Sequence, residues 1–241
     1  MPLPDTRSPL WRGDGTSQAA LSVVAAPGPA LTGLAIRVRG LTATGVCAAE
    51  AATRAGATRL SLVDDAWSDA EDHALPPAAR GSRARRTARL VGELRPDLTL
   101  DLDTTRAVDG EIVVAFGSVA PPVAHLLAVE DRPHVAVLVD ESGALVLPVV
   151  PGESACLRCR DVALTQADPA WPVLARQCEA RAPVTDPLCA AVAGALAAAS
   201  LAVLLGGGRA LAWRVEGGLP SRAAVAAHEA CGCEAARRSA A

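Results

Sequence analysis

Residues 34–65 read LAIRVRGLTATGVCAAEAATRAGATRLSLVDD, and this stretch decides the fold. The apolar runs Leu34–Gly40 and Arg59–Asp65 predict two strands. Small residues dominate the intervening segment, Gly45–Ala57, which predicts a helix that packs closely on its neighbours. A strand, a helix and a strand in this order and length predict one β-α-β unit with two parallel strands.

The alternation of strands and helices continues after this unit. Helices are predicted over 79–94 and 120–129, and strands over 98–102, 111–116, 134–139 and 144–150. The turn residues Glu141–Gly143 separate the last two strands and indicate a hairpin at one edge. We therefore predict an α/β fold with a Rossmann-like, mostly parallel but mixed sheet.

The C-terminal part contains a helical stretch over 161–180, a long helix after Asp186 and a strand near 210–215. The uncharged run Leu188–Leu205 is rich in Ala and falls short of the about 20 apolar residues that cross a membrane. We interpret it as a buried core helix and expect no membrane association. No linker divides the chain after residue 30, so we expect one domain over 31–235. We expect residues 1–30 to form a loosely packed arm.

Composition excludes several classes of protein. A net charge of -3 gives no basic surface for nucleic acid. The N-terminus lacks the apolar segment of a secretory signal, which favours a cytoplasmic, reducing location. All 23 basic residues are Arg, so no lysine is present to bind phosphate or to act in catalysis.

Two close cysteine pairs are the strongest chemical signal in the sequence. Cys156 and Cys159 form a CxxC motif, and Cys231 and Cys233 form a second pair near the C-terminus. Four thiolates suit the tetrahedral coordination of a structural zinc. Such a site would tie the C-terminal segment to the middle of the chain and add metal-binding free energy to folding.

Three alternatives stay open for these cysteines. The CxxC motif alone can be a redox dithiol, although the second pair would then go unexplained. His228 can replace one thiolate as a ligand. The cysteines can also be unpaired buried residues, which is our expectation for Cys47 and Cys189 in Ala-rich helical stretches.

A partial nucleotide-binding motif follows the first predicted strand. Gly40 and Gly45 stand where glycines let a backbone approach phosphate, but no glycine lies between them. Asp64 ends the second strand, where an acid commonly accepts ribose hydroxyls. A tight turn and a solvated strand end are the alternative explanations.

These motifs together resemble the ThiF/MoeB/HesA family, the bacterial relatives of ubiquitin-activating enzymes. The resemblance covers about Leu34 to Cys233 and is best in RLSLVDD, PVVPGESACLRC, RQCEARAPVTDPLCAAVAGALAAASLAVLL and HEACGC. It implies a Rossmann-like core, a zinc on the two cysteine pairs and dimers. It also implies ATP-dependent adenylylation of the C-terminus of a small carrier protein. Actinobacterial ThiF-like proteins of peptide-modifying systems, some of which bind leader peptides, are similar too.

The departures from the family fall on its chemistry. An Arg-containing pair that contacts ATP phosphates is missing from 68–74, and no acid for magnesium occurs near 116–118. The family lysine falls near Arg83 and Arg85, which are the candidate replacements. Cys178 matches the cysteine that takes the carrier covalently in some members, and a structural cysteine is its alternative role.

The sequence therefore supports two main hypotheses. The first is a ThiF-like protein, with weakened or lost catalysis, that uses Mg-ATP on a carrier-protein or peptide tail. The second is a non-catalytic scaffold that binds a leader peptide or forms a homo- or heterodimer with an active partner. A nucleotide-binding oxidoreductase is a third hypothesis, against which the cysteine pairs argue.

Overall fold

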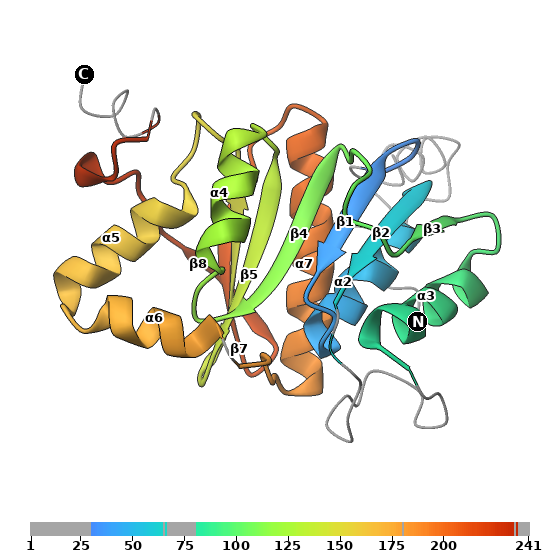
Figure 1. The fold of residues 1–241 in the computed structure, drawn as a ribbon, viewed down its shortest axis with the longest axis horizontal. Helices are drawn as coiled ribbons and strands as arrows, with labels where there is room; N and C mark the ends of the chain where they lie inside the picture. Colours follow the sequence, from blue (N-terminus) through green and yellow to red (C-terminus); the bar gives the residue numbers. More distant parts are fainter. Residues whose placement is uncertain (1–29, 65, 67–80, 180, 234, 236–241) are drawn as a thin grey trace, which may run out of the picture.

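The computed structural model describes residues 30–64, 66, 81–179, 181–233 and 235. They contain one eight-stranded sheet in the order β3-β2-β1-β4-β5-β6-β7-β8 (Figure 1). The strands are β1 Ala35–Arg39, β2 Arg59–Val63, β3 Thr99–Asp101, β4 Gly110–Phe116, β5 His134–Asp140, β6 Gly143–Val149, β7 Ala212–Glu216 and β8 Leu219–Ala223. Strands β1 to β5 pair in parallel, and β6, β7 and β8 follow antiparallel. The predicted mixed α/β sheet is confirmed.

Helices lie on both faces of the sheet. One face carries α2 (Ala43–Arg54), α3 (Arg83–Leu94) and α7 (Pro187–Leu205), and α4 (Pro121–Val129) lies on the other (Figure 1). Helices α5 (Leu157–Ala167) and α6 (Trp171–Glu179) extend beyond the β5–β8 side. A short 3-10 helix, η2 (Glu229–Cys231), packs against α5 near the C-terminus.

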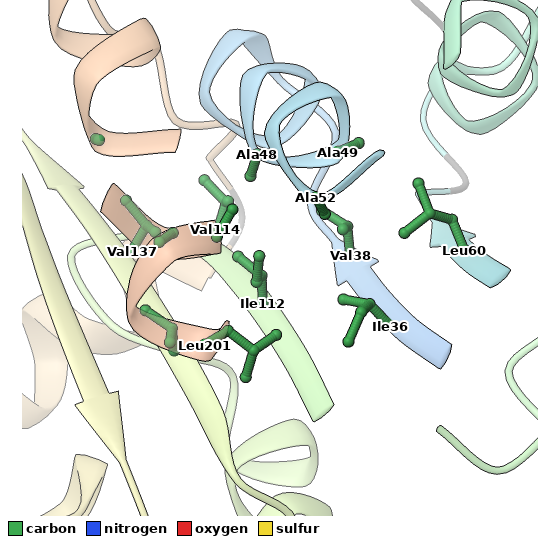
Figure 2. Close-up of a cluster of buried hydrophobic side chains, with 14 of the residues drawn as sticks. Ile36, Val38, Ala48, Ala49, Ala52, Leu60, Ile112, Val114, Val137 and Leu201 are labelled. Atoms are coloured by element: carbon green, nitrogen blue, oxygen red, sulfur yellow. The ribbon is translucent and has the colours of Figure 1, made fainter. Parts of the chain in front are cut away.

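The main core lies between the sheet and the layer of α2 and α7. Alternate residues of the parallel strands point into it, as Figure 2 shows for Ile36, Val38, Leu60 and Ile112. Helix α7 is long and apolar enough to cross a membrane, but it packs on α2 and the sheet. The prediction of a core helix is thus confirmed. A Cβ on its Gly194 would come 2.7 Å from the Ala48 nitrogen, so the two helices touch through their small residues.

Two predictions about elements need correction. The helical stretch predicted over 161–180 is two helices, because α5 ends at Ala167 and α6 starts at Trp171. Pro169 lies in the break; it has no N–H to donate and disfavours helical backbone at Asp168. Strand β8 was not predicted, since its sequence, LPSRA, has no apolar alternation and is mostly exposed. The predicted arm over 1–30 lies outside the described residues apart from Ala30.

An ion pair ties the antiparallel edge to the end of β5. The Arg214 guanidinium donates from both terminal nitrogens to Asp140, at 2.7 and 2.6 Å. Burial raises the pKa of Asp140, but the hydrogen bonds from Arg214 and Ser142 outweigh it and bring that pKa from 3.8 down to about 2. A lowered carboxyl pKa stabilises the fold above the ordinary pKa, and this contribution disappears as pH falls through the folded value.

We therefore expect Asp140→Asn to weaken the acid sensitivity of the fold. Urea unfolding of the native protein should show stability falling from pH 4 to pH 2, and the variant should show a flatter profile. At pH 7 the variant should lose only about 1 kcal/mol, because the pair is partly exposed and screened by solvent. Identical profiles for the two proteins would contradict the assignment to Asp140.

Candidate functional site

The glycine loop after β1 is closely packed. Gly40 has a φ of +80°, and a Cβ there would meet the Val114 carbonyl oxygen at 2.2 Å. A Cβ on Gly45 would come 1.9 Å from the Gly40 carbonyl oxygen. Both positions therefore require glycine for the loop to lie against β4 and on itself, whether or not a phosphate binds there.

Asp64 holds this loop in place. Its carboxylate accepts the Leu41 N–H at 2.7 Å and the Ala66 N–H at 2.9 Å. The structure thus brings Asp64 to the glycine loop, as the nucleotide motif predicts. Each oxygen keeps a second lone pair for a ligand, so contact with a ribose stays a prediction.

The first turn of α2 faces the same edge of the sheet. Thr42 is the N-cap residue, and its buried hydroxyl has no hydrogen-bond partner among the described residues. The N–H groups of a first helical turn have no partner within the helix and attract anions. The Thr44 and Thr185 hydroxyls bond at 2.8 Å, so the segment before α7 reaches the glycine loop.

The start of α3 lies beside the segment that follows Asp64. Arg83 donates its N–H to the Ala66 carbonyl at 2.9 Å. Its side chain and that of Arg86 are buried, whereas Arg85 and Arg89 are exposed. An arginine cluster on one helix is usually a solvated face, but here only two of the four arginines are solvated. The predicted loss of an arginine over 68–74 falls outside the described residues.

A carboxylate reaches the carboxyl end of β4 from another element. No acid follows β4, as the sequence indicated, but Ser118 there donates to Asp161 of α5 at 3.3 Å. Trp171 and Arg160 donate to the second oxygen of Asp161, each at 3.3 Å, and the guanidinium lies 5.3 Å from the centre of the Trp171 ring. Burial raises the pKa of Asp161, and Arg160 opposes that rise. Sequence analysis missed this residue because nothing in its local motif links α5 to β4.

Cys178 lies at the same edge. Its sulfur packs on Gly117, where a Cβ would be only 2.7 Å from the Sγ atom. Burial raises the pKa of the Cys178 thiol and Glu141 adds to the rise, while Arg181 and Arg160 oppose it. Arg181 and Arg160 thus do not offset the rise, and the thiol stays protonated near neutral pH.

We expect Cys178 to alkylate slowly at pH 7. Iodoacetamide reacts with the thiolate, so the rate should climb through and above pH 9, the ordinary thiol value. Mass spectrometry of the Cys178 peptide, with Cys178→Ser as the blank, measures this rate. Fast labelling at pH 7 would instead support the covalent role of Cys178.

The two cysteine pairs form one cluster. The sulfurs of Cys156 and Cys159 are 3.7 Å apart, and the Cys156–Cys231 and Cys159–Cys233 distances are both 3.5 Å. All four sulfurs lie within 4.8 Å of one another. Zinc–sulfur bonds of about 2.3 Å in a tetrahedron place sulfurs roughly 3.8 Å apart, whereas a disulfide needs about 2.05 Å. The donor set therefore fits a zinc ion.

The alternative ligand and the core cysteines can be placed as well. His228 is not in the cluster; it accepts the Ala230 N–H and bonds to Gln166 at 2.8 Å. Cys189 is buried in the main core, as expected, and Cys47 is half-buried against Gly194 of α7.

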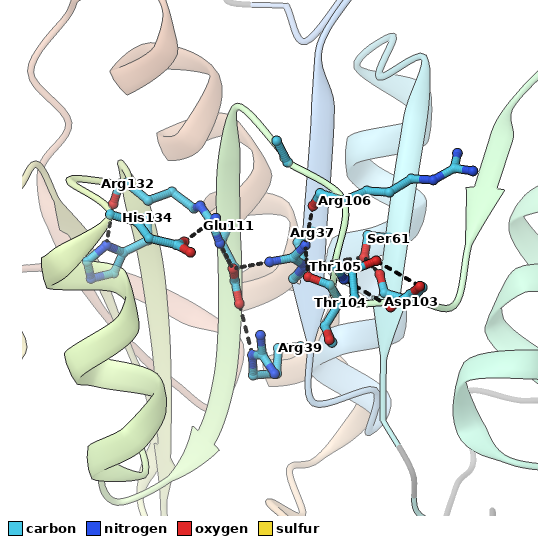
Figure 3. A network of polar contacts seen from close by, with 12 residues as sticks. Arg37, Arg39, Ser61, Asp103, Thr104, Thr105, Arg106, Glu111, Arg132 and His134 are labelled. Atoms are coloured by element: carbon cyan, nitrogen blue, oxygen red, sulfur yellow. Dashed lines mark hydrogen bonds and ion pairs between the residues drawn. The ribbon is translucent and has the colours of Figure 1, made fainter.

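A buried charge network links the neighbouring strands β1 and β4 (Figure 3), and sequence analysis missed it. The fully buried Glu111 carboxylate forms ion pairs with Arg39 at 2.9 Å, Arg132 at 2.8 Å and Arg37 at 3.4 Å. Arg37 also donates to the carbonyls of Thr104 and Arg106 in the β3–β4 connection. Charged residues at alternate positions of an apolar strand were the available signal, because residues two apart in a strand share one face.

Comparison with known proteins finds similarity in structure only. No family model matches the sequence, and no curated protein matches it. A structure of the microcin C7 biosynthetic enzyme MccB with N-formylated MccA has a TM-score of 0.66 at 14% identity, covering 85% of this chain and 68% of MccB. E. coli MccB with ATP gives a TM-score of 0.64 at 14% identity, covering 84% and 67%. The chain has the MccB fold.

MccB is a ThiF/MoeB-family, ubiquitin-activating-like adenylyltransferase, so the predicted resemblance is confirmed at the level of the fold. The chain spans about two thirds of the MccB length. Another structure of E. coli MccB gives a similar TM-score of 0.65 at 13% identity, covering 86% of this chain and 66% of MccB. A fold shared at this identity carries no residue roles with it.

Proposed function

We propose that this chain binds Mg-ATP at the carboxyl edge of β1, β2 and β4 and acts on the C-terminus of a peptide or small carrier protein. The reaction class is adenylylation, in which a terminal carboxylate attacks the α-phosphorus of ATP and pyrophosphate leaves. Support comes from the MccB fold, since MccB has been crystallised with ATP and with the MccA peptide.

The observation that carries this proposal is a group of unpaired hydrogen-bond donors beside the glycine loop. Strands β1 and β4 are neighbours in the sheet, and the strands that follow each of them in sequence lie on opposite sides of this pair. Ligands of open α/β sheets bind at such switch points. The unpaired Thr42 hydroxyl and the first-turn N–H groups of α2 lie there as donors for phosphate. Asp64 would receive the ribose hydroxyls, and Arg83 and Arg85 are the candidate phosphate cations.

Asp161 is our candidate for the acid that is missing after β4. It accepts a hydrogen bond from Ser118, which follows Gly117, the residue that Cys178 packs on. A carboxylate there would bind magnesium, whose charge would offset that of the phosphates. The chain has no lysine, and Cys178 is not activated, so we expect slow turnover at best.

The scaffold alternative rests on a different observation. Packing against Val114 and within the loop itself already requires Gly40 and Gly45, and both Asp64 oxygens already bind backbone N–H groups. In that case the same domain, residues 31–235, would bind a leader peptide or form a dimer with an active partner. Both hypotheses include a structural zinc on the four cysteines, a cytoplasmic location and no nucleic-acid ligand.

Calorimetric titration of the zinc-loaded protein with Mg-ATP separates the two hypotheses. Micromolar binding that Asp64→Ala abolishes would support the nucleotide site. Asp97→Ala is the matched control, because Asp97 is exposed and pairs with Arg95 just after α3. The absence of binding at millimolar ATP would reject adenylylation by this chain alone and favour the scaffold.

A further inference from the structure

A cavity of about 1010 Å³ lies away from the glycine loop, between α4 on one side and α5 and α6 on the other. This volume is at the upper end of ordinary ligand sites. Its apolar walls include Ala124, Ala128, Val149, Pro151 and Leu157. Figure 1 shows the helices that line it, with α4 on the face of the sheet opposite α2 and the α5–α6 pair beside α4.

Helix α4 presents an apolar stripe to this cavity. Pro121, Ala124 and Ala128 line it together with His125, and their spacing of three and four residues places them on one face of the helix. Leu127 alone among the residues of α4 is buried in the core. The nine residues of α4 span roughly 14 Å at 1.5 Å per residue. An extended chain rises about 3.3 Å per residue, so roughly four residues of a peptide cover that length.

One end of the cavity holds an unpaired acceptor. The His134 Nδ1 atom donates to the Arg132 carbonyl at 2.8 Å, which leaves Nε2 as the bare ring nitrogen. His134 is 3% exposed and lines the cavity, and its Nε2 has no partner among the described residues. Figure 3 shows its ring turned away from Glu111. A buried acceptor without a donor costs stability, so this atom is set up to receive one.

Two carboxylates stand at the same end. Asp131 precedes His134 by three residues, and Glu153 follows Val149, the cross-strand partner of His134. Both line the cavity from exposed positions. The cavity lining also includes Asp161 and Glu179, and against these acids it carries two cations, Arg158 and Arg176. Four carboxylates thus outnumber two guanidinium groups around a neutral acceptor, which favours a ligand with a cationic side chain and several N–H donors.

We propose that this cavity binds an extended segment of about four residues from a peptide partner, with an Arg or Lys side chain at His134, Asp131 and Glu153. Apolar residues of the peptide lie along the α4 stripe. The opposite end of the cavity contains Ser118 and Asp161, so a bound peptide runs toward the carboxyl edge of β4. This inference names the partner chemistry of the proposed function and rests on it for the direction of the peptide.

Selection from a phage-displayed random heptapeptide library on the full-length, zinc-loaded protein tests the proposal without ATP. We expect enriched peptides that combine a basic residue with apolar residues. Fluorescein-labelled copies should bind at least tenfold more weakly to Ala128→Trp, which fills the cavity from an exposed position. Leu126→Trp is the matched control, because Leu126 is exposed on the same helix and does not line the cavity.

The paired change Asp131→Asn with Glu153→Gln should remove the preference for a basic residue while apolar peptides still bind. Enrichment of peptides without basic residues, or binding that Ala128→Trp leaves intact, would overturn the proposal, as would no enrichment at all. Thermal melts and zinc content check that each variant is folded. Peptide binding without Mg-ATP binding would keep this inference and reject adenylylation, and the reverse result would do the opposite.

Discussion

Cys159→Ser should remove zinc from the protein and unfold its C-terminal segment. Cys159 is fully buried and its sulfur lies 3.7 Å from Cys156 and 3.5 Å from Cys233, so serine would remove a central ligand of the cluster. Structural zinc sites contribute on the order of 10 kcal/mol in small domains. The cluster packs on a small apolar group that includes Ala155, and only Cys156 and Val225 of that group also touch the second core cluster around Leu157, so few apolar contacts among the described residues hold this segment besides the zinc.

We expect the main sheet to survive this change, because its core does not include the cluster. The melting temperature of the main sheet should fall by only about 10 °C, which corresponds to about 3 kcal/mol at roughly 2–4 °C per kcal/mol, because most of the zinc-binding free energy is lost locally in the C-terminal segment. Atomic absorption should give one zinc per native chain and none in the variant, and limited proteolysis should cut near 225–233 first. Cys47→Ser is the matched control, since Cys47 is a half-buried cysteine on α2 outside the cluster. A zinc-free native protein with an unchanged C-terminal segment would refute the assignment.

The cysteine cluster could be predicted from sequence because zinc ligands come in closely spaced pairs. Cys156 and Cys159 are fixed by one helix start, and Cys231 and Cys233 by one turn, so each half of the site is local. The β-α-β unit was predictable for a similar reason, since strand and helix periods appear within a few residues. The tetrahedral coordination of zinc by four thiolates then predicted that the two pairs lie together.

The groups that complete the candidate sites could not be predicted in this way. Asp161 reaches Ser118 only because α5 folds back on β4, and His134 faces a cavity whose other wall is α4. Such contacts depend on the packing of distant elements, which no local period encodes. The glycine motif was found in the sequence, but its cause was not. Only the structure shows that packing alone requires glycine at Gly40 and Gly45.

The second large effect is expected at Glu111, whose replacement by Gln should cost about 3–5 kcal/mol, as for other buried ion pairs that lose one partner. Its carboxylate is fully buried and binds Arg37, Arg39 and Arg132. Burial lowers the pKa of Arg37, and the charge of Glu111 is the main influence that opposes this. Without the carboxylate, three guanidinium groups would face one another in a place that water reaches poorly.

Urea unfolding at pH 7 measures this effect, with Glu130→Gln as the matched control. Glu130 also pairs with Arg132, but its side chain is 38% exposed, so its loss should cost less than about 1 kcal/mol. Replacing Arg37 by Leu in the Glu111→Gln background should recover part of the loss, because the two residues share one network. A cost below 1 kcal/mol for Glu111→Gln would mean that water or a rearranged loop satisfies the arginines. The β3–β4 connection, which Arg37 holds through the Thr104 and Arg106 carbonyls, would then not depend on the network for its position.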